Sequence, residues 1–295
     1  MNKLIYTSDI PFDMSDWEKL PIRNVYAGKN CIMAICDDGS AIQKIKDESK
    51  AARMQFWTRI KQISISKCIE GLAIGLVEDG TCLIGKRAAR FACEITKASF
   101  DDLNDAVKEW ENIVQVEASD ALFVLDGNGK VYYLAFSEFC SRDYIEVLLW
   151  KGIKRIVTGV QNSIFGITEE GKVLCAGANC REKYKDLDNF SDIIDVFPTG
   201  SECEKLYLVH RDGTVSEYSD GKIEGILCEE ASLPTKRLDG TFGYSVYALT
   251  KDGAISGVSY ENLEAPFEGS SDITSFAVGD AGYPISFVIA TERIR

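Results

Sequence analysis

Short apolar runs alternate with polar turns along the chain, a pattern typical of β-strands joined by tight hairpins. Six mostly apolar runs each end at an acidic residue or Asn followed by glycine, and a second, shorter apolar run follows the turn. The six turns are Asp38-Gly39, Asp79-Gly80, Asn128-Gly129, Glu170-Gly171, Asp212-Gly213 and Asp252-Gly253. Because such dipeptides supply the positive φ that a two-residue turn needs, each unit predicts a β-hairpin.

The hairpins are copies of one repeat, since their turn glycines are 41, 49, 42, 42 and 40 residues apart. Six residues before the glycines stand the large apolar residues Met33, Ile74, Phe123, Phe165, Tyr207 and Tyr247. Two residues after them stand Ala41, Cys82, Val131, Val173, Val215 and Ile255. A fixed period of about 40 residues predicts a repeat architecture in which each unit buries its hydrophobic face against its neighbours.

A third strand precedes each hairpin and occurs in seven copies, whereas only six turns are complete. The missing hairpin is split between the chain ends: residues 285–293 resemble the strand before a turn, and residues 2–7 the strand after it. Closed rings leave no long unpaired sheet edge. We therefore expect residues 1–295 to form one all-β domain, a seven-bladed β-propeller closed by pairing of the N- and C-terminal strands.

The repeat resembles that of the regulator-of-chromosome-condensation family. The best copy spans residues 153–184, and its matching positions are Gly159, Ser163, Gly171, Val173, Gly177 and Asn179. Two family features are missing: Ala176 replaces the usual Trp, and no copy has the His after the first Gly. The short repeats are similar to those of the compact bacterial members, among them a β-lactamase inhibitor. The resemblance implies a seven-bladed propeller and a family of exchange factors, inhibitors and scaffolds; the segment on which exchange activity depends has no match.

Three stretches interrupt the β pattern. Residues 99–110 place Phe100, Leu103, Val107 and Trp110 on one helical face. A capping-box pattern predicts a second short helix over residues 15–20. Residues 44–61 form the third stretch, which is basic and aromatic in an acidic protein.

The chain carries 46 acidic against 33 basic residues and a formal net charge of −13. Such a charge repels nucleic acids and anionic membranes and favours basic partners or simple solubility. We expect a cytoplasmic monomer, because the N-terminus does not read as a signal peptide and no apolar window is long enough to span a membrane. The ten cysteines are then expected to be mostly reduced, and several to be buried, since Cys82 fills a slot that other copies give to valine.

Sequence motifs for catalysis, metal binding or phosphate binding are weak. The chain has one histidine, His210, at a predicted strand end with no nucleophile paired to it in the sequence. Cys31/Cys36 and Cys175/Cys180 have spacings that a zinc site could use, but packing accounts for Cys36 and Cys175. Phosphate-binding loops are missing, and paired carboxylates carry little information in an acidic protein. We therefore assign no catalytic, cofactor or metal residue.

These observations favour a non-catalytic protein-interaction platform, because a propeller holds loops of free sequence on a stiff ring. An inhibitor or immunity-type factor for a basic partner is one form of it. The alternative is a lyase or hydrolase that uses carboxylates in the central channel. For the binding residues we predict Arg53, Phe56, Trp57 and Arg59, because Trp and Arg are enriched in binding hot spots. Packing of Phe56 and Trp57 between blades is the competing expectation.

Overall fold

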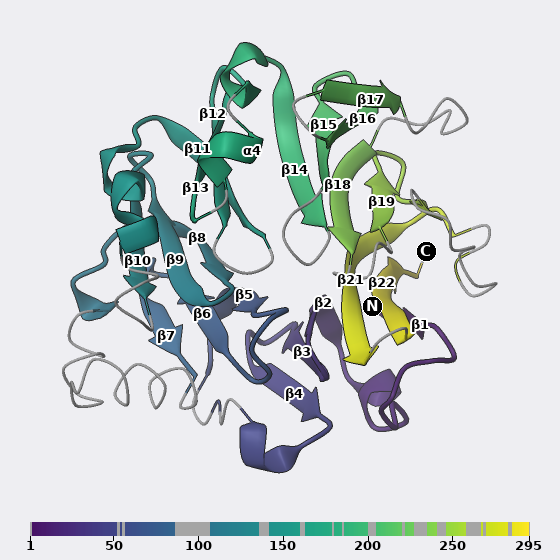
Figure 1. The fold of residues 1–295 in the computed structure, drawn as a ribbon. Helices are drawn as coiled ribbons and strands as arrows, with labels where there is room; N and C mark the ends of the chain where they lie inside the picture. The colour runs from purple at the N-terminus through teal and green to yellow at the C-terminus, as the bar shows by residue number, and fades with distance from the viewer. Residues whose placement is uncertain are drawn as a thin grey trace.

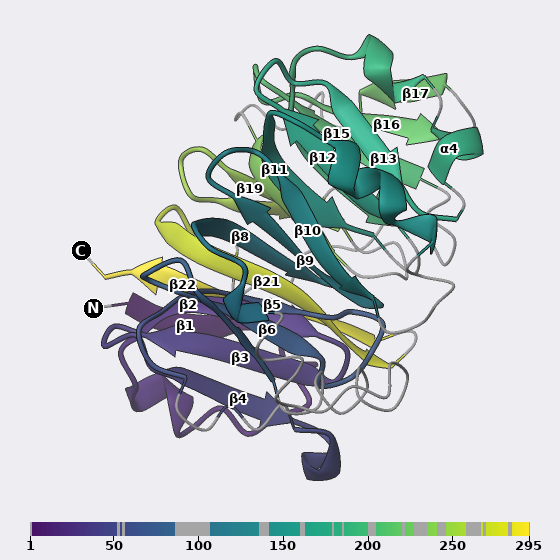
Figure 2. The ribbon, with the colours of Figure 1, turned by 90° about the vertical axis from the view of Figure 1, so that its left-hand side faces the viewer.

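The structure is a computed structural model. It describes residues 2–51, 54, 57–85, 107–135, 142–159, 163–178, 180–184, 186–199, 205–219, 222–226, 235–240, 246–257, 267, 270–282 and 285–294. These residues form seven antiparallel sheets around a common centre, the blades of a β-propeller (Figure 1). Turning the molecule shows the sheets packed face to face (Figure 2).

Six blades have three described strands and one has four. Blade 1 consists of β2 (Ile22–Gly28), β3 (Cys31–Cys36) and β4 (Ala41–Ile45). Blade 2 consists of β5 (Ile60–Ile65), β6 (Ala73–Val77) and β7 (Cys82–Ile84). Blade 3 consists of β8 (Ile113–Ala118), β9 (Ala121–Asp126) and β10 (Val131–Ala135). Blade 4 consists of β11 (Ile153–Thr158), β12 (Ile164–Thr168) and β13 (Val173–Ala176).

The second half of the ring follows the same plan. Blade 5 consists of β14 (Ile193–Thr199), β15 (Lys205–His210), β16 (Val215–Ser219) and the extra β17 (Lys222–Ile226). Blade 6 consists of β18 (Thr235–Gly240), β19 (Val246–Thr250) and β20 (Ile255–Gly257). Blade 7 consists of β21 (Ile273–Gly282), β22 (Ile285–Arg293) and β1 (Asn2–Tyr6).

Blade 7 confirms the predicted closure. Strand β1 pairs antiparallel with β22, in a register that runs from Asn2 opposite Arg293 to Tyr6 opposite Ile289. The two termini accordingly lie side by side in both views (Figures 1 and 2). The split repeat therefore joins the first and last residues of the ring into one sheet.

The turn glycines connect each blade to the next. The carbonyl of Gly39 accepts a hydrogen bond from the Ile60 N–H at 2.9 Å, and the same bond joins Gly171 to Ile193 at 3.1 Å. A Cβ at Gly171 would lie 2.7 Å from the Ile193 nitrogen, and the residue has φ 82°. Glycine is required here for the close approach as well as for the positive φ.

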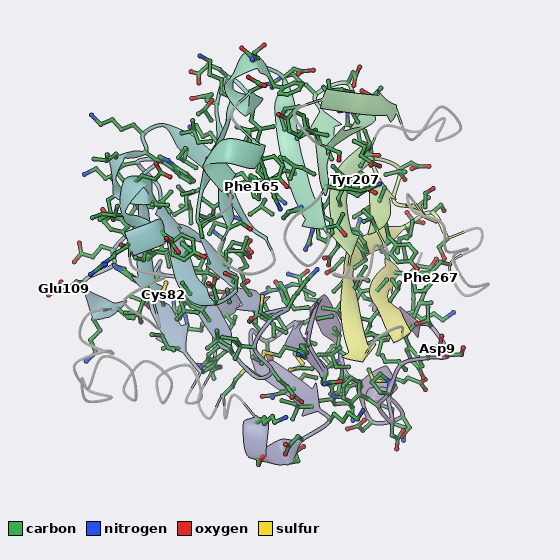
Figure 3. All side chains as sticks on the ribbon, in the orientation of Figure 1. Asp9, Cys82, Glu109, Phe165, Tyr207 and Phe267 are labelled. Carbon is green, nitrogen blue, oxygen red and sulfur yellow. The ribbon has the colours of Figure 1, made fainter. Side chains whose placement is uncertain are left out.

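The core lies between neighbouring blades. Side chains such as Phe165 and Tyr207 lie inside the ring of sheets, whereas Asp9 and Glu109 project outward (Figure 3). One cluster joins Phe165 of blade 4 to Val196 and Leu208 of blade 5. Each sheet is thus buried on both faces, which explains the apolar middle strands.

The short helical elements are η1 (Trp17–Lys19), η2 (Glu48–Lys50), η3 (Ile145–Leu149), α4 (Cys180–Lys183) and η4 (Leu187–Asn189). The helix predicted over residues 15–20 is the single 3₁₀ turn η1, with Asp16 as its N-cap. Most of the helix predicted over residues 99–110 lies outside the described residues, but Val107 is buried as its predicted apolar face requires. Within the described part, the longest helical element is far too short to cross a lipid bilayer.

Candidate functional site

The seven inner strands bring one polar position of every repeat to the central channel. Each strand has a β-bulge directly after its first residue, and such bulges re-aim the side chain that follows. That position, the first ring, holds Asn24, Gln62, Gln115, Arg155, Asp195, Arg237 and Ser275. The second ring, two residues further along, holds Tyr26, Ser64, Glu117, Val157, Phe197, Asp239 and Ala277.

In blades 2, 3 and 7, first-ring side chains connect their blade to the backbone of the next. The Gln62 amide donates to the Val116 carbonyl at 3.1 Å and accepts from the Val116 N–H at 3.3 Å. Gln115 makes the same pair of bonds with Ile156, at 2.6 and 2.9 Å. Ser275 accepts from the Val25 N–H at 3.2 Å, which extends the pattern across the closure.

Charged residues take over this role in blades 4 to 6. Arg155 binds Asp195 in a bidentate ion pair, with Nε–Oδ1 and Nη2–Oδ2 distances of 2.8 and 3.0 Å. Although burial opposes its charge, the Asp195 carboxylate keeps the pKa of Arg155 above its ordinary value. Lys67, in the loop after β5 of blade 2, reaches across the channel to the Asp239 carboxylate and the Gly240 carbonyl of blade 6.

The rings enclose a cavity of about 300 Å³. It is lined by every second-ring residue and by first-ring residues of blades 2 to 6, together with Lys67. Glu117 lies deep in the molecule and faces this cavity. Burial raises the pKa of Glu117, while Arg155, the Gln115 amide and Arg237 offset part of that rise. The channel therefore holds a dense set of ionisable groups in a partly desolvated space.

The ring was not recognised in the sequence, although its signal is there. Each third strand begins with an apolar residue or Thr, then any residue, then a polar one: Ile22-Arg23-Asn24 and Ile153-Lys154-Arg155 are two copies. This position interrupts the strict alternation of a strand because of the bulge. Aligning the repeats on the third strand, rather than on the turn glycine, would have revealed it.

Among the described residues, exposed apolar side chains gather on η3, next to blade 3. A 3₁₀ helix repeats every three residues, so Tyr144, Val147 and Trp150 form one buried row. Ile145, Leu148 and Leu149 lie on the other sides and are 64%, 55% and 77% exposed. We call these three residues the η3 patch. The core does not need them, and contiguous exposed apolar residues mark interaction sites more often than isolated ones do.

The predicted binding residues are not brought together on a rim. Trp57 is buried, only 6% exposed, and packs between blades 1 and 2, with its ring over Gly75. This corrects the expectation that Trp57 is exposed and agrees with the competing one. Arg53 and Phe56 lie outside the described residues.

Arg59 is exposed but lies close to two carboxylates. Its side chain lies 3.5 Å from the Glu78 carboxylate and 3.9 Å from that of Asp79. It has φ 56°, and the equivalent positions before β8 and β11, Asn112 and Gly152, share this left-handed conformation. Lys44 and Lys50 of the same stretch form ion pairs with Asp16 and Glu70. Partner binding by residues 44–61 stays a prediction.

His210 makes two side-chain hydrogen bonds that its neighbours in the sequence do not predict. Its Nδ1 lies 2.9 Å from Asp192 Oδ2 and its Nε2 2.8 Å from Ser216 Oγ. This is the order of groups in a hydrolytic triad, but Ser216, on β16, is only 3% exposed. Because the Ser216 hydroxyl is buried, we interpret the array as a structural brace.

Three cysteines of the described residues act as packing residues. Cys31, Cys36 and Cys82 are buried thiols without disulfide bonds, and burial raises the pKa of Cys31 and of Cys82 to about 12. Among the residues that the structure describes, three or more His, Cys, Asp or Glu side chains never gather as they do around a metal ion.

Comparison with known proteins supports the architecture. The sequence matches neither a protein-family model nor a curated protein, but the structure is similar to many solved ones. Prp20p from Saccharomyces cerevisiae has a TM-score of 0.65 at 11% identity, over 99% of this chain and 91% of that one. Human WBSCR16 has a TM-score of 0.58 at 10% identity, over 94% and 88%.

A third solved β-propeller is somewhat less similar. The β-propeller domain of Cps50 (Swd1) from Myceliophteria thermophila has a TM-score of 0.55 at 10% identity, over 94% of this chain and 97% of that one. Prp20 is also described as yeast RCC1, in a complex with Kap60, with a TM-score of 0.65 at 11% identity over 100% of this chain and 89% of that one. The arrangement of the blades thus agrees with these comparisons: the chain folds as a seven-bladed β-propeller, and its fold is similar to that of yeast RCC1.

Proposed function

We propose that this chain is a protein-interaction platform and that the η3 patch is its docking point. The observation that carries the proposal is the exposure of Ile145, Leu148 and Leu149 on a short helix whose other side is firmly buried. Apolar side chains on an anchored helix of this kind offer contact area at a small entropic cost. The solved neighbour Prp20 is described as binding Gsp1p and histones and, in a second structure, Kap60, which supports a platform role by analogy of fold.

The partner is a basic protein. A chain with net charge −13 repels a second copy of itself and attracts cationic surfaces, which raises the association rate at low salt. A cytoplasmic inhibitor or immunity-type factor for such a partner fits this charge. In this proposal the η3 patch supplies the apolar anchor, and the negative net charge of the chain supplies the electrostatic steering.

The test uses the variant Leu148→Asp/Leu149→Asp as bait in extracts of the native cell. Both side chains are exposed, so the fold should survive, and the melting temperature checks this. Ile294→Asp, another exposed apolar residue near the C-terminus, is the matched control. We expect the double variant to lose its main partner by at least about 30-fold, the effect of removing one hot spot of about 2 kcal/mol, while the control retains it.

A salt series separates the two parts of the proposal. Raising the ionic strength should slow association with the partner, because the steering term is screened. A photo-crosslinking residue at position 149 should label the partner directly. Equal capture by the double variant and the parent, together with labelling that is absent at position 149, would exclude the η3 patch as the docking point.

A further inference from the structure

Arg237 departs from the pattern of the first ring. Gln62, Gln115, Arg155, Asp195 and Ser275 make hydrogen bonds to the next blade, whereas the Arg237 guanidinium contacts the next blade only through the Phe276 ring, 5.7 Å from its centroid. Within the part of the chain that the structure describes, no acceptor is within hydrogen-bond distance of it. A guanidinium has five N–H donors in a planar fork that matches a carboxylate. Arg237 therefore faces the cavity with its donors unused.

Glu117 is the complementary exception. It accepts a 3.0 Å hydrogen bond from the Gln115 amide and two long contacts of 3.4 Å from hydroxyls, but the described residues provide no ion pair for it. The other cavity carboxylates are matched, Asp195 by Arg155 and Asp239 by Lys67. Among the described residues that line the cavity, Arg237 and Glu117 thus remain as one cation and one anion without a direct ion-pair partner.

The two groups lie on opposite sides of the channel. Glu117 belongs to β8 in blade 3 and Arg237 to β18 in blade 6, and these strands face each other across the ring (Figure 1). The channel is narrow here, because the Lys67 side chain alone crosses from the blade 2 loop to blade 6. The cavity lining also includes the apolar residues Val157, Phe197 and Pro198, and the Lys67 ammonium lies 5.0 Å from the centroid of the Phe197 ring. A small molecule with an apolar side chain would fill this space.

We propose that the channel cavity binds an apolar α-amino acid in its zwitterionic form. The ligand carboxylate takes the Arg237 guanidinium, the ammonium group takes the Glu117 carboxylate, and the side chain lies against Val157 and Phe197. A simple organic anion would satisfy Arg237 but face the Glu117 charge, and a simple cation would face Arg237. Only a ligand with both charges matches both groups.

The first test measures binding of L-leucine and L-phenylalanine to the purified chain by isothermal titration calorimetry. N-acetyl-L-leucine, which lacks the positive charge, and L-leucinamide, which lacks the negative one, are the matched controls. We expect the free amino acids to bind and each blocked form to bind at least about 30-fold more weakly, as when one partner of a buried charge pair is removed. Equal binding of N-acetyl-L-leucine would reduce the site to an anion site, and failure of both free amino acids to bind would overturn the proposal.

Variants of the chain assign the two contacts. Glu117→Gln should abolish binding of the free amino acid while sparing or improving that of N-acetyl-L-leucine. Arg237→Gln should abolish binding of both the free amino acid and N-acetyl-L-leucine. Arg237→Lys keeps the positive charge and the cation–π contact but loses the planar fork of donors, so it tests whether the fork itself is needed. Arg211→Gln removes an exposed arginine that does not line the cavity and serves as the control. Because the η3 patch is a separate surface, partner capture should be unaffected by these variants; amino acid binding that persists in Arg237→Gln and Arg237→Lys would refute the assignment.

Discussion

Trp150 and Gly166 test whether the inter-blade core is packed as the structure indicates. The indole of Trp150 lies over Gly166 in β12, where a Cβ would be 2.7 Å from Trp150 Cζ3 and 3.1 Å from Ile153 Cδ1. Both distances are shorter than normal contacts. The same arrangement joins Trp57 to Gly75 in blade 2. We therefore expect each tryptophan to depend on the glycine that it covers.

The expected magnitudes follow from this geometry. Gly166→Ala should reduce the free energy of unfolding by about 1–3 kcal/mol, the cost of overpacking. Trp150→Ala should cost about 3–5 kcal/mol through the cavity it leaves. With the indole gone, Gly166→Ala should instead stabilise by about 0.4–1 kcal/mol, because alanine restricts the unfolded chain more than glycine does. The coupling energy is then about 1.5–4 kcal/mol.

Urea denaturation followed by far-UV circular dichroism measures all four proteins of the cycle. The crossed pair Gly166→Ala/Trp57→Ala is the control, since residues in different blades should give additive effects within about 0.5 kcal/mol. Additive effects for Trp150 and Gly166, or a harmless Gly166→Ala in the parent, would show that the indole does not occupy this position.

Three further predictions address other parts of the ring. Deleting residues 1–8 removes β1 and exposes the edge of β22, so light scattering should detect aggregation; a soluble monomer with an unchanged melting temperature would contradict the role of closure. Cys31 and Cys82, whose thiol pKa burial raises to about 12, should resist Ellman's reagent at about pH 8 and react in urea; rapid reaction in the native state would refute their burial. Hydrogen bonds from the Thr81 hydroxyl and N–H lower the pKa of Asp79 below its ordinary value of 3.8. The stabilisation that the ionised Asp79 provides is therefore complete above pH 3.8 and is lost as the pH falls through the lowered pKa. Asp79→Asn should flatten the decline of the melting temperature in acid, and an unchanged decline would argue against a contribution of Asp79 to stability.

The sequence was sufficient for the blade count and the closure because both depend on local chemistry. The turn glycines combine a positive φ with the close approach of the next blade, as at Gly171. No other residue replaces them, so the spacing of the repeats can be recognised in the sequence. The split seventh hairpin followed from counting third strands. Each of these features is fixed by a few residues within one repeat.

The position of Trp57 could not be read from one copy of the repeat. A tryptophan near arginines has the composition of a binding hot spot, and only the pairing with Gly75 shows that it fills a gap in the next strand. Trp150 and Gly166 stand in the same register, but that register is visible only once the sheets are assembled. The composition of this stretch therefore predicted an exposed binding site, whereas Trp57 belongs to the core between two blades.

The inward carboxylates of the channel, which favour an enzyme when viewed alone, have a different explanation in this ring. Asp195 is held by Arg155 and also lies 3.5 Å from the Leu238 N–H of the next blade, while Asp239 accepts from the Val278 N–H at 3.1 Å. These charges replace the amide bridges that Gln62 and Gln115 make elsewhere, so their first role is to join blades. Positions that break a repeated rule without a structural return are where function is expected. By that criterion Arg237, rather than the acidic residues as a group, marks the chemistry of the channel.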